Sequence, residues 1–125
     1  RTSIIGHELD GARSLVGWFL AQSGTVKGFR KAIFSGLPTV EIARVIRDYV
    51  IPNPELSGVY HVSADPINKL DLLELLARIY GKSINIQPDD NLVINRSLDS
   101  TRFRQATGFK PKSWPELVKI MHDFE

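Results

Sequence analysis

The stretch Phe34-Ser35-Gly36-Leu37-Pro38-Thr39, followed by Val40-Glu41-Ile42-Ala43-Arg44-Val45-Ile46-Arg47-Asp48-Tyr49-Val50, decides the fold class. An apolar run typical of a strand comes before it, and apolar residues at helical spacing come after it: Ile42, Val45, Ile46, Tyr49 and Val50. We expect Gly36 to allow an unusual backbone angle, Pro38 to set a first-turn dihedral and Thr39 to cap the helix. The pattern predicts a strand that turns sharply into a core-facing helix. Such junctions often carry ligand contacts in α/β proteins, although an ordinary connecting loop fits the same residues.

Length and composition limit the chain to one modest domain. With 125 residues, of which 42% are hydrophobic, it can bury a core without disulfides or a structural metal. The absence of cysteine excludes thiol catalysis, cysteine zinc sites and a disulfide framework, and it is compatible with the cytoplasmic location that we expect. A formal net charge of +2 gives no argument for a nucleic-acid partner, and no apolar run approaches the roughly 18 residues of a membrane span.

The first residues of the chain have the pattern of a strand from inside a larger fold. Its first residues, Arg1-Thr2-Ser3-Ile4-Ile5-Gly6, form a β-like run, and the single methionine is Met121. We therefore expect a C-terminal piece of a longer protein, whose first strand pairs with strands outside this sequence, although a cleaved leader would also explain the start. The apolar face next to that strand predicts self-association.

Two helices carry the clearest local signals. One has Asn68 as its cap, Gly81 as its end and a buried stripe of Leu72, Leu73, Leu76, Ile79 and Tyr80. The other opens with the capping box Ser113-Trp114-Pro115-Glu116 and is faced by Leu117, Ile120, Met121 and Phe124. The remaining expected elements are a helix with Leu15, Trp18, Phe19 and Leu20 on its apolar face, strands within 26–34 and at 59–63, 83–88 and 92–96, and a short helix that ends at Gly108.

Charged side chains suggest one candidate anion site. Lys27, Arg30 and Lys31 lie within five positions and are able to grip a ligand such as a pyrophosphate, or else they line a solvated strand face. Asp89 and Asp90 lack the ligand count and spacing of a calcium loop, so we expect them to be solvated rather than bound to a metal.

Recognisable catalytic signatures are missing. The sequence contains no G-x-G-x-x-G loop, P-loop, G-x-S-x-G elbow or H-E-x-x-H helix. His61 has no carboxylate or second histidine near it in the sequence, so we expect it to be structural. We name no catalytic residue and no metal ligand, and expect the chemistry to depend on residues outside this sequence.

Four motifs in this order and spacing resemble a known family: Arg1-Thr2-Ser3-Ile4-Ile5-Gly6, Gly36-Leu37-Pro38-Thr39-Val40-Glu41-Ile42-Ala43, Gly58-Val59-Tyr60-His61-Val62 and Arg96-Ser97-Leu98-Asp99-Ser100. The whole chain resembles the C-terminal third of an extended short-chain dehydrogenase/reductase acting on nucleotide sugars. Within this NAD-dependent epimerase/dehydratase superfamily it is most similar to the dTDP-4-dehydrorhamnose reductase family.

The resemblance implies an α/β fold that is the C-terminal fragment of a Rossmann-type enzyme. Residues 1–10 would be a late strand and loop of the Rossmann sheet, and residues 11–125 a small mixed α/β lobe that binds a nucleotide-diphospho-sugar. In the family, the N-terminal Rossmann domain holds NAD(P), and a Tyr-x-x-x-Lys pair with a serine or threonine acts on the 4-keto sugar. All of these would precede Arg1, so we expect this fragment alone to be inactive and to bind no cofactor.

The resemblance also implies a set of site residues. Arg96 would contact the phosphates of the nucleotide, although it could instead pair with a surface carboxylate such as Asp99. The other implied contacts are Lys27, Arg30 and Thr39 for the substrate, and Ser3 and Ile4 for the cofactor.

Two departures from the family leave the reaction open. Ile4 stands where the rhamnose reductases have a tryptophan, and Ile33-Phe34 stand where they have Asp-Gln. Reduction in polysaccharide biosynthesis, epimerisation or dehydration of a nucleotide sugar, and a non-catalytic regulatory subunit therefore all remain compatible with the sequence. A homo-oligomer is compatible with each.

Overall fold

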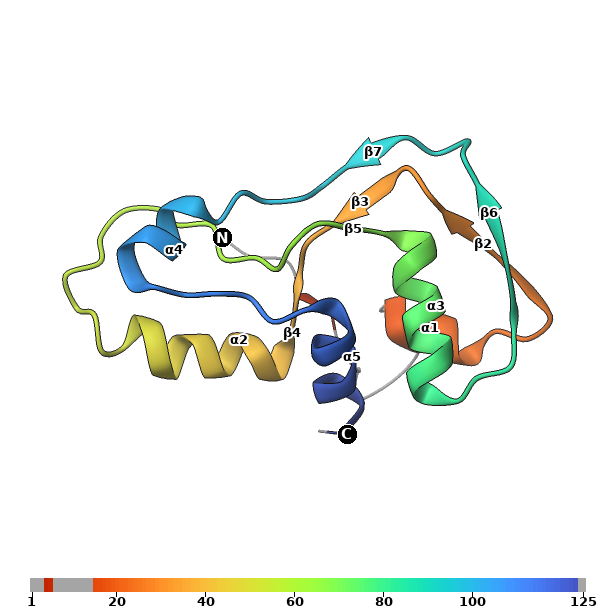
Figure 1. Cartoon of the computed structure of the whole chain (residues 1–125), viewed down its shortest axis with the longest axis horizontal. Coiled ribbons are helices and arrows are strands. Elements are labelled where there is room, and N and C mark those ends of the chain that lie inside the picture. Colours follow the sequence, from red (N-terminus) through yellow and green to blue (C-terminus); the bar gives the residue numbers. More distant parts are fainter. Residues whose placement is uncertain (1–3, 6–14, 124–125) are drawn as a thin grey trace.

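Two extended stretches, 25–34 and 85–95, run side by side in the same direction and organise the chain (Figure 1). The computed structural model describes residues 4–5 and 15–123. β2 (Thr25–Phe29) pairs in parallel with β6 (Asn85–Asp89), and β3 (Ala32–Phe34) pairs in parallel with β7 (Ile94–Asn95). β5 (Ile67–Asn68) lies antiparallel on the other side of β3. Val26 and Gly28 of β2 are buried while Lys27 between them is exposed, as expected for strands with one face on a core.

The strand-to-helix junction forms as predicted. β4 (Leu37–Pro38) pairs in parallel with β1 (Ile4–Ile5), so that Ile4 lies opposite Leu37. The α-helix α2 (Thr39–Val45) begins directly after β4, and Ser35 and Leu37 are almost fully buried. The chain therefore passes from one small sheet into another and then into a helix within six residues.

Two details of this junction differ from the prediction. Gly36 is not one of the described glycines with positive φ, so its backbone angle needs no glycine. Pro38, with φ −57° and ψ 145°, occupies the cap position, and Thr39 is already helical and makes no capping hydrogen bond. Because Pro38 sits one position before the first helical residue, the cap falls where no side-chain acceptor is present.

The predicted apolar stripe of this helix holds only in part. After Val45 the helix widens into the π-helix η1 (Ile46–Val50), in which the N–H of Ile51 donates to the carbonyl of Ile46 at 2.9 Å. The wider turn takes later side chains off the 3.6-residue stripe. Val45, before the widening, is 1% exposed as predicted. Val50, within the wider turn, is 37% exposed and Ile46, at its first position, is 46% exposed, both contrary to the prediction.

The main core lies where three helices and the sheet meet. α3 (Lys69–Tyr80) contacts α5 (Trp114–Asp123), and α5 in turn contacts α2. Fully or nearly fully buried side chains include Leu72, Leu73 and Leu76 of α3 and Leu117, Val118 and Met121 of α5. Each such side chain contributes about 1.5–3 kcal/mol relative to exposure. α1 (Leu15–Ala21) adds Val16 and Phe19 to this core, but Trp18 is 38% exposed and does not belong to the predicted face.

Local capping signals predicted the helix ends correctly. Asn68 accepts a hydrogen bond from Asp71 N–H at 2.8 Å, and Gly81 ends α3 at φ +67°. At the start of α5, Ser113 Oγ accepts from Glu116 N–H at 3.4 Å and donates to Glu116 Oε1 at 3.0 Å. Ile120 is half-buried, and Phe124 lies outside the described residues.

A second, aromatic cluster holds the other end of the molecule. Phe103 of α4 (Thr101–Thr107) and Phe109 pack with ring centroids 5.6 Å apart, and Tyr49 meets Phe109 edge-on at 5.4 Å. Tyr60 contacts Phe103 in the same way at 6.1 Å. Residues 59–63, predicted as a strand, have no regular secondary structure: Tyr60 and Val62 pack against this cluster, and no described strand pairs with the segment. α4 ends at Gly108 with φ +76°, as predicted.

Within the described residues, no helix is long and apolar enough to cross a membrane.

Candidate functional site

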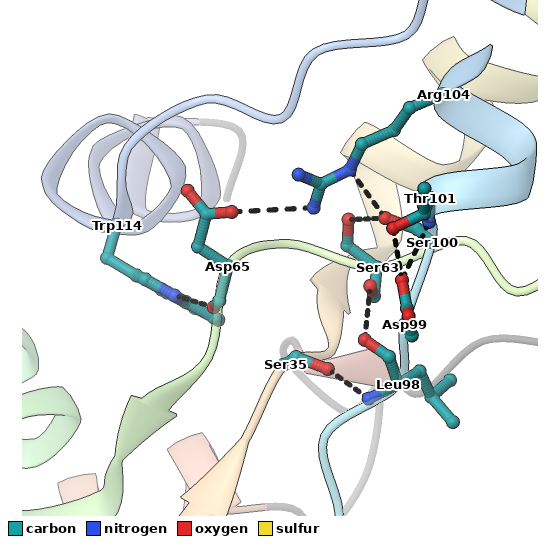
Figure 2. Close-up of polar contacts among 9 residues, drawn as sticks. All are labelled: Ser35, Ser63, Asp65, Leu98, Asp99, Ser100, Thr101, Arg104 and Trp114. Carbon is teal, nitrogen blue, oxygen red and sulfur yellow. Dashed lines mark hydrogen bonds and ion pairs between the residues drawn. The ribbon is translucent and has the colours of Figure 1, made fainter.

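Three buried serines hold two loops onto the end of β3 (Figure 2). We call Ser35, Ser63 and Ser100 the serine clamp. The Ser35 carbonyl accepts from Ala64 N–H at 2.9 Å, and its hydroxyl accepts from Leu98 N–H at 2.8 Å. Ser63 Oγ donates to the Leu98 carbonyl at 3.0 Å. Because these groups are buried, losing a partner would leave an unsatisfied polar atom, so the loops at 61–66 and 96–100 are fixed in position.

The clamp continues into both C-terminal helices. Arg104 Nε of α4 donates to Ser100 Oγ at 2.6 Å, and Arg104 Nη2 lies 3.4 Å from Asp65 Oδ1. Trp114 Nε1, at the start of α5, donates to the carbonyl of Asp65 at 2.6 Å. The sequence did not indicate this network, because Ser35 and Ser63 bind the backbone of Leu98, which lies 63 and 35 residues away from them.

Asp99 is engaged inside its own turn. Its Oδ1 accepts from the backbone N–H of Thr101 at 2.9 Å and from Thr101 Oγ1 at 2.5 Å. These bonds, the hydroxyl one first, lower the pKa of Asp99 below its ordinary value, and the charge of Arg104 adds to the effect. The structure therefore gives Asp99 a partner other than Arg96.

Arg96 stands at the point where β7 leaves the sheet and enters the clamped loop. Its backbone N–H donates to the Ile33 carbonyl at 2.9 Å, which fixes the main chain beside β3. Asn95 Oδ1 then accepts from both the N–H and the hydroxyl of Ser97, at 2.9 and 2.6 Å, and so closes a tight turn around Arg96. The Arg96 side chain is exposed and has no hydrogen bond or ion pair with any described residue. A guanidinium on a fixed backbone is thus left available to an anion.

Of the three cations in the candidate anion site, Arg30 and Lys27 are already paired, whereas Lys31 is exposed and its side chain has no hydrogen bond or ion pair with a described residue. Arg30 makes a two-bond contact with Asp90, at 2.8 Å from Nε and 2.5 Å from Nη2, and Lys27 Nζ lies 3.8 Å from Asp89 Oδ2. The hydrogen bond from Arg30 lowers the pKa of Asp90. The expectation that both aspartates are solvated is wrong for Asp89, whose side chain is 11% exposed and also accepts from Asn91 N–H at 2.7 Å.

The predicted site residues do not form one cluster. Strand register places Arg96 beside Phe34. Lys27 precedes Phe34 by seven residues along β2 and β3, so an extended chain puts Lys27 up to about 23 Å away from Arg96. Thr39 is exposed on the first turn of α2, beyond β4. Ile4 pairs in register with Leu37, and Ser3 lies outside the described residues. Among the predicted substrate and cofactor contacts (Arg96, Lys27, Arg30, Thr39, Ser3 and Ile4), Arg96 alone is an exposed cation without a described partner.

A buried ion pair supports the helix beside the site. Glu41, only 2% exposed, binds Arg44 through both carboxylate oxygens, and Arg44 also approaches Asp48 to 3.7 Å. The hydrogen bonds that Arg44 donates to Glu41 raise the pKa of Arg44. Sequence reasoning treated Glu41 only as part of the helix, because the spacing i, i+3 by itself does not indicate burial.

Residues 4–5 and 15–123 contain no cluster of three or more metal-ligating acidic, histidine or cysteine side chains.

Comparisons with known proteins place the fold. The chain matches no protein-family model and no curated protein. Solved structures do share its fold: dTDP-4-dehydrorhamnose reductase from Bacillus anthracis in complex with NADP (TM-score 0.77, 14% identity) covers 97% of this chain and 45% of its own. The corresponding reductase from Clostridium acetobutylicum gives a TM-score of 0.76 at 16% identity, with the same shares of 97% and 45%. UDP-N-acetylglucosamine 4-epimerase from Bacillus cereus gives 0.75 at 16% identity, covering 98% and 45%.

These matches confirm the predicted fold class, a mixed α/β unit like part of a Rossmann-type short-chain dehydrogenase/reductase. The chain spans about 45% of the length of the structures it matches. Identities of 14–16% establish the fold alone.

Proposed function

We propose that this chain is the substrate-binding part of an NAD(P)-dependent nucleotide-sugar reductase of the dTDP-4-dehydrorhamnose reductase type. The proposal rests on the ordered sequence motifs together with a fold shared with a rhamnose reductase bound to NADP. In it, residues 1–10 belong to the Rossmann sheet and residues 11–125 form the lobe that binds a nucleotide-diphospho-sugar.

The parallel pair β1–β4 supports this division. Each strand has two residues, and parallel sheets occur almost only as larger sheets covered on both faces. A two-residue parallel ladder gains little stability by itself. We therefore assign β1 to the edge of a longer Rossmann sheet, against which β4 of the lobe pairs, with Ser3 and Ile4 as the predicted contacts to the cofactor.

The cofactor does not fit this chain alone. The sequence has no glycine-rich dinucleotide turn, and none of its tyrosines is followed four residues later by lysine. Hydride transfer therefore requires groups that these residues do not supply, and no catalytic step is assigned to them. Their role in the proposal is to bind and orient the sugar nucleotide.

Arg96 is the observation that carries the proposal. Its side chain is exposed and without a described partner, while the backbone on both sides is held by Ile33 and by the Asn95–Ser97 turn. A guanidinium so placed presents parallel N–H donors that match the oxygens of a diphosphate. Lys27, Arg30 and Thr39 are secondary contacts in the proposal. Binding through Lys27 or Arg30 would require the ligand to compete with Asp89 or Asp90.

Epimerisation is the second candidate reaction, since a UDP-N-acetylglucosamine 4-epimerase shares the fold at nearly the same TM-score. The names of both proteins indicate a nucleotide sugar as substrate, so the proposed contact of Arg96 with the phosphates of the ligand would serve either reaction in this chain. Substrate turnover by the full-length protein distinguishes the two: NAD(P)H is consumed in reduction, whereas epimerisation leaves its concentration unchanged.

Steady-state kinetics of Arg96→Ala in the full-length protein tests the proposal. We expect the KM for the nucleotide sugar to rise about tenfold or more, as loss of a charge-assisted bond worth about 1.5–3 kcal/mol predicts, with unchanged affinity for NAD(P)H. An unchanged KM would refute the assignment of Arg96. Equal losses for sugar and cofactor would indicate misfolding instead.

A further inference from the structure

α3 and β6 lie at the end of the molecule opposite α4 (Figure 1). A groove is lined by residues of α3, of β6 and of the segment that connects them. Its volume is about 340 Å³, and it is lined by Glu74, Ala77, Arg78, Lys82, Ile84 and Ile86. The floor is apolar, with Ala77 on the helix side and two isoleucines on the strand side, while three charged side chains form the rim. No residue assigned to the nucleotide-sugar site lines it.

The strand that borders this groove has a free edge. β6 pairs with β2 and with no other described strand. Asn85 N–H donates to the Gly24 carbonyl at 2.9 Å, and Arg30 N–H donates to the Asp89 carbonyl at 3.1 Å. Residues 85, 87 and 89 therefore turn their backbone groups toward β2, and Ile86 turns its N–H and carbonyl outward, since direction alternates along a parallel strand. The groove and the unpaired backbone groups lie along the same residues.

Pro88 limits this free edge to its first part. Proline has no N–H to donate and is typical of edge strands that must not pair along their whole length. Strand addition is thereby confined to the neighbourhood of Ile84 and Ile86, the two strand residues that line the groove.

The rim carries a charge gradient. β6 starts five residues after α3 ends, so it runs back along the helix, with Ile84 near Arg78 and Lys82 and Ile86 toward Glu74. Arg78 and Glu74 are exposed and have no side-chain bond to a described residue, and Lys82 uses one of its three donors on the Leu20 carbonyl at 3.0 Å. One end of the groove is therefore basic and the other acidic.

We propose that the groove binds an extended peptide segment of a partner protein, which adds to β6 as an antiparallel strand. Its outward N–H and carbonyl groups bond to those of Ile86, and one apolar side chain enters the groove between Ala77 and Ile84, as in other peptide recognition by strand addition. The antiparallel direction sets its basic N-terminal half against Glu74 and its acidic C-terminal half against Arg78 and Lys82. This surface is independent of the proposed nucleotide-sugar site.

A labelled peptide tests the proposal with the whole chain. The probe is a fluorescein-labelled eight-residue peptide with lysines in its N-terminal half, valines at alternate positions, and glutamates before a free C-terminal carboxylate. We expect saturable one-site binding by fluorescence anisotropy. Arg78→Glu should weaken it at least about tenfold, because a charge-assisted contact becomes a repulsion. The matched control is Lys110→Glu, an equal charge change at an exposed residue beyond α4, which should change the affinity less than about twofold.

Amide hydrogen exchange then identifies the mode of binding. Exchange at Ile86 N–H should slow in the presence of the peptide, while Gln87 N–H, already turned toward β2, should not change. The proposal is overturned by absence of saturable binding, by equal losses in the two variants, or by unchanged Ile86 exchange. It is also overturned if a peptide with its charges reversed end to end binds as tightly, or if Ile86 is protected without peptide through self-association, which would make a second copy of the chain the occupant.

Discussion

The molecule contains two arginine–carboxylate pairs of the same geometry in opposite surroundings. Arg44 binds both oxygens of Glu41, which is 2% exposed, beside the strand-to-helix junction. Arg30 binds both oxygens of Asp90 at the end of the β2–β6 ladder, where the side chains are 53% and 40% exposed. Water competes for the second pair and is excluded from the carboxylate of the first, so equal contacts have unequal consequences.

The same contrast separates structural polar groups from those available to a ligand. The serine clamp is buried: Ser35 and Ser63 bind the backbone of Leu98, and Ser100 Oγ donates to the Ser63 carbonyl, so these residues serve the fold. Along the β2–β6 and β3–β7 pairs, the exposed side chains of Lys27 and Arg30 have ion-pair partners, whereas those of Arg96 and Lys31 have no hydrogen bond or ion pair with a described residue. We therefore expect ligand contacts along the β2–β6 and β3–β7 strand pairs, and we expect the serine clamp to hold the neighbouring loops in position.

Replacing Glu41 by alanine should have the largest effect on stability. The substitution would leave the partly buried Arg44 guanidinium without its main partner. We expect the free energy of unfolding to fall by about 3 kcal/mol, the lower end of the range for breaking a buried ion pair. The lower end applies because Asp48, at 3.7 Å, partly compensates the charge of Arg44. Urea denaturation measures the loss. The matched control, Glu74→Ala, removes an exposed glutamate from a helix and should leave the midpoint nearly unchanged. Equal midpoints for both variants would show that burial does not set the effect.

Ser35→Ala should cost less, about 1–2 kcal/mol, because Leu98 N–H loses its acceptor in a buried position. Ser57→Ala, at an exposed serine, is the control. The denaturation midpoint should fall for the first variant only. Amide exchange at Leu98 should accelerate at the same time, and a stability loss without that acceleration would contradict the clamp as its cause.

Breaking the exposed pair of Arg30 and Asp90 should have the smallest effect on stability, and the effect should be visible only in how stability depends on pH. Since the pKa of Asp90 is lowered in the folded state, its contribution is present above the ordinary aspartate pKa and is lost as the pH falls below about 4. Asp90→Asn should therefore leave the denaturation midpoint at pH 7 nearly unchanged and slightly flatten its decline in acid. A large change at pH 7 would mean that the pair is shielded from solvent.

Local sequence signals predicted the elements whose ends are locally determined. Asn68 and Gly81 bound α3 because a cap and a left-handed residue act within one turn. The widening at Ile46 was not predictable, since the residues fit an ordinary apolar stripe, and the strand expected at 59–63 failed because its partner depended on tertiary packing.

The sequence indicated which cationic residues are candidates for the site, but not how they are paired in the fold. Arg96 was identified through the family resemblance, and its side chain has no hydrogen bond or ion pair with a described residue, while its contact with a ligand stays a prediction. The pairing of Arg30 with Asp90 joins residues 60 positions apart, and the contact of Ser35 with Leu98 joins residues 63 apart. Neither separation leaves a pattern in a single sequence, so the cations could not be sorted into paired and available ones beforehand.

Calorimetric titration of the chain with dTDP tests the central claim most directly, because it compares an available arginine with a paired one. Arg96→Ala should weaken binding about tenfold or more, whereas Arg30→Ala, which removes a cation already bound to Asp90, should change the affinity less than about twofold. Equal losses in the two variants, or a larger loss for Arg30→Ala, would contradict the account.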